Sequence, residues 1–107
     1  MMQYKDFRGE VSLSRLGMGT MRLPREGNQP GAPIDFAKSE TIIDKAMASG
    51  INYYDTARAY TDSEEKLGAA FGPLGIRDQI YLATKTHAKT PEEFWQHLET
   101  SLRLLQT

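Results

Sequence analysis

Ile-Asn-Tyr-Tyr-Asp-Thr-Ala-Arg-Ala-Tyr, residues 51–60, is the stretch that decides the fold. Its first half is a β-branched and aromatic run that follows Gly50 and ends on Asp55, as expected for a buried parallel strand that delivers a polar group to its carboxyl end. A turn carrying Tyr60 follows. Asp62-Ser-Glu-Glu65 then opens a helix with N-capping side chains and acidic residues that suit the helix dipole. The stretch therefore predicts a strand, a polar loop and a helix.

A second unit repeats this order further along the chain. Residues 79–85, Gln-Ile-Tyr-Leu-Ala-Thr-Lys, form an apolar run of strand length that ends on Lys85. Thr90-Pro-Glu-Glu93 then begins a helix with a capping box and with proline at its first position. Lys85 thus takes the place that Asp55 holds one unit earlier. Because the carboxyl ends of parallel strands share one rim, we expect the two side chains at the rim where such folds keep their chemistry.

These residues also carry a resemblance to a known family. Asp55-Thr-Ala-x-x-Tyr60, followed by a strand ending Ala-Thr-Lys85, resembles the aldo-keto reductase family. The resemblance implies an α/β fold, the (β/α)8 barrel. It also implies a nicotinamide cofactor, which is usually NADPH but can be NADH, and a small aldehyde or ketone as substrate. It also implies that Asp55, Tyr60 and Lys85 are catalytic, together with a histidine that follows the fourth strand and lies outside these residues.

The length of the chain covers only part of such a barrel. A closed (β/α)8 barrel takes ~250 residues, whereas this sequence has 107. We therefore expect one domain, residues 1–107, that forms the N-terminal portion of a TIM barrel. It would hold a β-hairpin at residues 4–13, centred on Arg-Gly-Glu, and three βα units at about residues 15–49, 51–72 and 79–105.

The first predicted strand, residues 16–24, contains two glycines. Spacing alone leaves two interpretations open, because a glycine in a strand permits either tight packing or the close approach of a ligand. The family resemblance assigns Gly19, Thr20 and Met21, together with Asp55, to the nicotinamide-ribose end of the cofactor. The ending Met-Arg-Leu-Pro24 further resembles the branch of the family that carries a cysteine-rich iron-sulfur extension near its C-terminus.

The three predicted catalytic residue types fit a proton transfer. A phenol is a weak acid, with an unperturbed pKa of about 10, and an adjacent ammonium favours its ionised form. Tyr60 would then donate the proton, Lys85 would supply the ammonium, and Asp55 would hold that ammonium in place. Each residue also has a purely structural interpretation, as a loop cap, a packed loop residue or a solvated strand end. The three types in this order favour catalysis over those separate roles.

Composition excludes several other classes of function. A net charge of −1 with 25% charged residues provides no basic surface for nucleic acid. The chain has no cysteine and only two histidines, which share no short motif, so neither a disulfide framework nor a metal site is expected. No apolar run approaches the ~20 residues of a membrane span, and residues 1–10 do not resemble a signal peptide. We therefore expect a cytoplasmic protein without membrane or nucleic-acid partners.

A second hypothesis belongs to a different class. Three parallel strands cannot close a barrel, so the edge of the third strand would stay exposed. In this interpretation the chain is a catalytically inactive barrel fragment, which acts by self-association or by complementation with the missing part of the barrel. The residues do not distinguish among carbonyl substrates.

Overall fold

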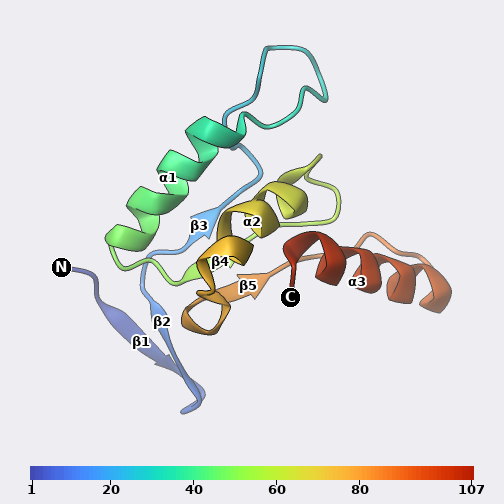
Figure 1. Cartoon of the computed structure of the whole chain (residues 1–107). Coiled ribbons are helices and arrows are strands. Elements are labelled where there is room, and N and C mark those ends of the chain that lie inside the picture. The colour runs from blue at the N-terminus through green and yellow to red at the C-terminus, as the bar shows by residue number, and fades with distance from the viewer.

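The computed structural model describes all residues from 1 to 107, and the chain begins with a hairpin (Figure 1). Strands β1 (Tyr4–Phe7) and β2 (Val11–Ser14) pair antiparallel, with Phe7 opposite Val11. The turn between them places Arg8 and Gly9 at positive φ, 58° and 72°. The hairpin therefore extends one residue beyond the range predicted from the sequence.

A three-stranded parallel sheet follows the hairpin. Its strands are β3 (Met18–Gly19), β4 (Tyr53–Asp55) and β5 (Tyr81–Ala83), in that spatial order. Gly19 pairs with Asp55, and Asp55 pairs with Ala83. The strand ends thus lie side by side on one rim, and β3 and β5 are the edges of the sheet.

The strands are shorter than the apolar runs from which they were predicted. The side chain of Asn52 accepts a hydrogen bond from the backbone N–H of Ser14 at 2.8 Å and donates to the carbonyl of Ser12 at 2.9 Å. These side-chain bonds connect the residue before β4 to the hairpin, while its backbone carbonyl accepts the N–H of Tyr81 in β5 at 2.7 Å. Gln79 belongs to a short 3₁₀ helix, Arg77–Gln79, instead of opening β5.

Each parallel strand is followed by a helix. The helices are α1 (Phe36–Ala48), α2 (Ser63–Phe71) and α3 (Pro91–Leu105), and a 3₁₀ turn, Gly72–Leu74, extends α2 (Figure 1). Side chains from all three helices pack around the central strand, which contributes Tyr54. The buried cluster consists of Ile43, Ala46, Tyr54, Leu67, Ala70, Phe71, Ile80 and Leu105. No helix is long and apolar enough to cross a membrane.

Helix capping follows the sequence prediction in part. The side chain of Thr90 accepts a hydrogen bond from the backbone N–H of Glu93 at 3.1 Å. The Glu93 carboxylate accepts the backbone N–H of Lys89 instead of that of Thr90. The capping box is therefore only half formed. Asp62, predicted to cap α2, makes no capping bond. Its carboxylate instead accepts the backbone N–H of Ile34 at 3.1 Å, which joins the loop before α1 to the start of α2.

The apolar face of α3 is less covered than its helical spacing predicts. Helical spacing places Phe94, Leu98, Leu102 and Leu105 on one face. Only Leu105 is buried, while Phe94 and Leu102 are 43% and 44% exposed. Trp95, at the flank of this stripe, is 60% exposed. The helix packs against α2 near its C-terminal end, and no element of the chain lies beyond β5. The N-terminal half of α3 therefore presents apolar side chains to solvent.

Because Tyr54 is buried, the stability of the folded chain decreases at alkaline pH. Tyr54 has no exposed surface, and its hydroxyl donates to the carbonyl of Ile51 at 2.9 Å. Desolvation by burial raises the pKa of Tyr54 from 10.0 to about 12. The folded state thus favours the neutral phenol, so this contribution to stability is complete below pH 10 and is lost as the pH rises through 12.

We expect the free energy of unfolding to fall by about 1 kcal/mol between pH 9 and pH 11 through this one group. Urea unfolding followed by circular dichroism at both pH values measures the loss. The variant Tyr54→Phe has no phenol to ionise at this position. Its free energy of unfolding should fall by about 1 kcal/mol less than that of the wild type, since the other tyrosines contribute equally to both proteins. Equal losses in the two proteins would contradict the prediction.

Candidate active site

Lys85 joins the ends of two neighbouring strands. Its Nζ donates to both carboxylate oxygens of Asp55, at 2.9 Å each, and to the backbone carbonyl of Thr56 at 2.6 Å. Backbone bonds continue the pairing beyond the strands, since the N–H of Thr56 donates to Ala83 and that of Arg58 donates to Lys85. The two predicted strand-end charges therefore meet in a bidentate ion pair at the rim.

The ammonium of Lys85 is stabilised in its charged form. Desolvation lowers the pKa of Lys85, but hydrogen bonding to Asp55 and the interaction with the Tyr60 phenol outweigh it, so the pKa lies above its ordinary value. The side chains of Lys85 and Asp55 are 50% and 35% exposed, so solvent weakens the pair. Lys85 is thus a fixed positive charge at neutral pH.

Tyr60 lies over this charge. The Nζ atom of Lys85 is 5.0 Å from the centroid of the Tyr60 ring. The backbone around Tyr60 is held in a turn, in which its N–H donates to Ala57 at 3.1 Å and its carbonyl accepts from Ser63 at 2.9 Å. The structure therefore gathers Asp55, Tyr60 and Lys85 at one place, although 30 positions separate the first from the last.

A cavity of about 250 Å³ opens beside these residues. It is lined by Gly19, Thr20, Met21, Arg22, Asp55 and Tyr60. Five of the six are residues that the sequence assigned to the cofactor or to catalysis. Arg22 is the exception. The only feature of the sequence that could have identified it as a lining residue is its position directly after Met21.

The cavity has room for only a part of a dinucleotide. A Cβ atom added to Gly19 would have no neighbour within 4 Å, so the space beside this glycine is open. Ligand pockets usually measure about 300–1,000 Å³, so the observed volume accommodates a part of a nicotinamide dinucleotide rather than all of it.

Buried hydroxyl groups fix the floor of the cavity. Thr20 donates to the carbonyl of Asp55, and Ser63 donates to the hydroxyl of Thr20, each at 2.8 Å. Because each hydroxyl has one proton, Thr56 must be the donor in its 2.8 Å bond to Ser63. All three side chains are fully buried. The Thr20 hydroxyl therefore holds the end of β3 against β4.

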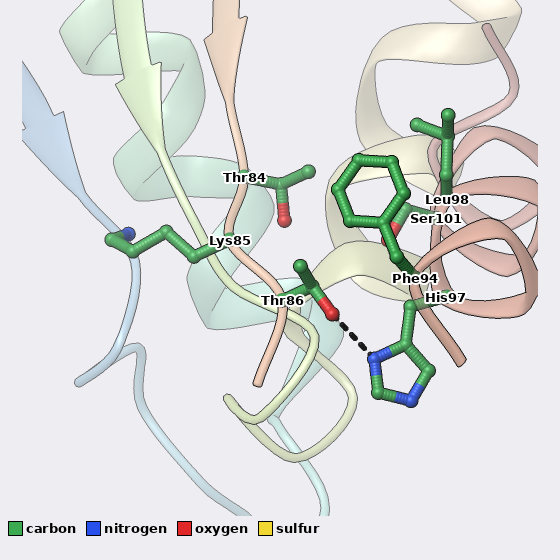
Figure 2. Close-up of a pocket in the computed structure, with 7 residues that line it drawn as sticks. All are labelled: Thr84, Lys85, Thr86, Phe94, His97, Leu98 and Ser101. Atoms are coloured by element: carbon green, nitrogen blue, oxygen red, sulfur yellow. Dashed lines mark hydrogen bonds between the residues drawn. The ribbon is translucent and has the colours of Figure 1, made fainter. Parts of the chain in front are cut away.

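A second cavity, of about 150 Å³, lies between β5 and α3 (Figure 2). It is lined by Thr84, Lys85, Thr86, Phe94, His97, Leu98 and Ser101. Figure 2 shows the side chain of Lys85 extending away from Phe94 and His97. His97 is bonded through Nδ1 to the Thr86 hydroxyl at 2.6 Å, and its ring lies 4.8 Å from that of His87. Neither Asp55 nor Tyr60 lines this cavity, so Lys85 is the one residue that it shares with the candidate active site.

The sequence of the chain matches that of a known protein family. The sequence model of the Aldo/keto reductase family matches residues 15–107. The chain belongs to this family. Among curated members it is 36% identical over 110 residues to the aldo-keto reductase YhdN of Bacillus subtilis, covering 91% of this chain and 32% of that protein. It is 35% identical over 81 residues to the aldo-keto reductase str7 of Strobilurus tenacellus, covering 72% of this chain and 24% of that protein.

Solved structures of the family share the fold of this chain. The aldo-keto reductase AKR11C1 of Bacillus halodurans, in its holo form, superimposes with a TM-score of 0.81 at 29% identity, covering 100% of this chain and 37% of that one. An aldo/keto reductase of Brucella melitensis gives a TM-score of 0.71 at 25% identity, covering 100% and 38%. The predicted family and the N-terminal portion of a (β/α)8 barrel are thereby confirmed. The chain spans 24–38% of the length of these proteins and does not close a barrel.

Proposed function

We propose that Asp55, Tyr60 and Lys85 supply the acid–base part of an active site. This site reduces small aldehydes or ketones to alcohols with NADPH, or alternatively with NADH. The observation that carries the proposal is the contact of the Lys85 ammonium with Asp55 and with the Tyr60 ring beside a cavity of suitable lining. Membership of the aldo/keto reductase family supports oxidoreduction of carbonyl compounds.

In this proposal, Gly19, Thr20, Met21 and Asp55 border the nicotinamide end of the cofactor. A reduced nicotinamide, when bound, supplies the hydride that reduces the carbonyl carbon. Tyr60 donates its phenolic proton to the carbonyl oxygen as negative charge develops there. The O–H bond of the phenol breaks and that of the alcohol forms, so the proton ends on the product.

The charges of Lys85 and Asp55 favour the proton transfer from Tyr60. When Tyr60 gives up its proton, its oxygen becomes negative, and the nearby ammonium stabilises that charge. The Asp55 carboxylate holds the ammonium by two hydrogen bonds and so keeps it in place before the reaction begins. Solvent then returns a proton to Tyr60 for the next turnover.

A chimera tests this function. Residues 1–107 would replace the matching part of the Bacillus subtilis relative, which aligns with 91% of this chain. We expect the folded chimera to oxidise NADPH only when an aldehyde is added. The unmodified relative serves as the positive control, and circular dichroism verifies that the chimera is folded. A folded chimera that binds NADPH but reduces none of a panel of aliphatic and aromatic aldehydes would overturn the proposal.

A second candidate function is favoured by the uncovered side of the chain. The edge of β5 is unpaired, and Phe94, Trp95 and Leu102 of α3 are exposed. An unpaired strand edge beside apolar side chains is a surface on which other chains assemble. In this proposal, the isolated chain is inactive and acts by self-association or by complementation with the rest of a barrel.

We expect the purified chain to form oligomers in multi-angle light scattering and to show no aldehyde-dependent oxidation of NADPH. The double variant Phe94→Lys/Leu102→Lys should shift the chain toward the monomer, because it places charge on the uncovered face. Glu99→Lys, at an exposed position of the same helix, is the matched control and should leave association unchanged. A monomeric wild-type chain with saturable NADPH binding and turnover would refute this candidate.

A further inference from the structure

Glu64 is the one charged residue of the chain that is buried, with 2% of its surface exposed. It lies in the first turn of α2, where an acidic side chain suits the helix dipole while remaining in water. Glu65, the next residue, follows that pattern and is exposed. Burying a carboxylate costs several kcal/mol unless partners compensate it, so the helix dipole does not account for the position of Glu64.

The two carboxylate oxygens of Glu64 have different partners. Oε1 is paired with the guanidinium of Arg58, whose side chain is 21% exposed. Oε2 accepts the hydroxyl of Thr84 at 2.8 Å. Arg58 belongs to the loop that carries Tyr60, whereas Thr84 directly precedes Lys85. One carboxylate therefore joins the Tyr60 loop to the strand end that carries Lys85.

The backbone closes this connection on the other side. The N–H of Arg58 donates to the carbonyl of Lys85 at 2.9 Å. Arg58 is thus held twice, through its backbone to Lys85 and through its side chain to Glu64. Tyr60 follows Arg58 by two positions, so movement of Arg58 would change the place of the Tyr60 ring over the Lys85 ammonium.

We propose that Glu64 is a positioning residue, whose carboxylate clamps Arg58 and Thr84 and thereby sets the spacing between Tyr60 and Lys85. Its importance for catalysis rests on the function proposed above. The clamp itself does not, because it is a property of the folded chain that can be measured without substrate or cofactor. Failure of the clamp and failure of the catalytic proposal are therefore distinguishable.

Nuclear magnetic resonance of the intact chain, labelled with ¹⁵N and with ¹³C in lysine and tyrosine, tests the clamp. Glu64→Gln keeps the size of the side chain but removes its charge. We expect hydrogen exchange of the Arg58 amide to accelerate at least about tenfold, since a lost ion pair leaves that loop free to open. We also expect a weaker nuclear Overhauser effect between the Lys85 ε-CH₂ and the Tyr60 ring, and a pKa of Lys85 closer to its ordinary value.

The matched control is Glu65→Gln, which removes an exposed charge from the neighbouring position and should leave all three measurements at wild-type values. Thr84→Val tests the other arm of the clamp if Glu64→Gln does not fold. It should also accelerate exchange of the Arg58 amide, whereas Thr84→Ser, which keeps the hydroxyl, should restore wild-type exchange. Wild-type exchange and an unchanged Lys85–Tyr60 contact in a folded Glu64→Gln or Thr84→Val variant would overturn the proposal.

Discussion

Replacing Tyr60 by phenylalanine in the Bacillus subtilis chimera is expected to lower kcat for aldehyde reduction by about 10²–10⁴-fold, the usual contribution of a positioned general acid. The substitution removes only the phenolic O–H and keeps the ring that lies 5.0 Å from the Lys85 Nζ. Cofactor binding should therefore remain nearly unchanged. Initial rates of NADPH oxidation measure kcat, and quenching of NADPH fluorescence measures binding.

Tyr53→Phe is the matched control for this experiment. Tyr53 lies on β4 two residues before Asp55, and its hydroxyl takes part in none of the hydrogen bonds that connect the site. Its substitution should leave kcat within about twofold of the parent chimera, as expected for a group that touches no reacting atom. Retention of most turnover by Tyr60→Phe would show that another group donates the proton.

The position of the predicted ion pair follows from features that are local in sequence. Asp55 and Lys85 each end an apolar run that precedes a polar loop, and parallel strands align such ends. The observed register, with Asp55 beside Ala83, brings them within 2.9 Å of each other. Strand periodicity and order were therefore enough to predict that these two charges meet. The catalytic roles of the residues stay a prediction.

The sequence could not indicate which polar side chains would turn inward. Asp62 and Glu64 have the same local character, since both stand at the acidic start of α2. Asp62 binds the backbone of Ile34, and Glu64 binds Thr84, 20 positions further along the chain. Such partners become neighbours only after the βα units have packed, so a local pattern predicts a helix cap for Asp62 and a solvated charge for Glu64.

The exposure of α3 has a similar cause. Helical spacing identifies Phe94, Leu98 and Leu102 as an apolar face, but it does not reveal whether another element covers them. Beyond β5 the sheet has no further strand, so the face near Phe94 and Leu102 stays open. Periodicity predicted the composition of the face, while its burial depends on neighbours that these residues do not include.

Replacing Gly68 by alanine is expected to destabilise the chain strongly. An added Cβ atom would lie 1.9 Å from the backbone carbonyl oxygen of Leu104 in α3. A backbone carbonyl cannot rotate away, so α2 and α3 would have to separate, and overpacking of this kind costs about 1–3 kcal/mol or more. Intrinsic helix propensity alone predicts the opposite, a gain of about 1 kcal/mol. We expect the clash to prevail, with a net loss of about 2 kcal/mol.

Gly72→Ala separates the clash from the general effect of adding a methyl group. Gly72 has helical angles, φ −55° and ψ −54°, so alanine fits its backbone. The added Cβ would meet the side-chain oxygen of Gln106, which is exposed and free to turn aside. Its unfolding free energy should therefore change by less than about 0.5 kcal/mol. Urea unfolding of both variants measures the difference, and similar values for the two would mean that the helices do not depend on their close approach at Gly68.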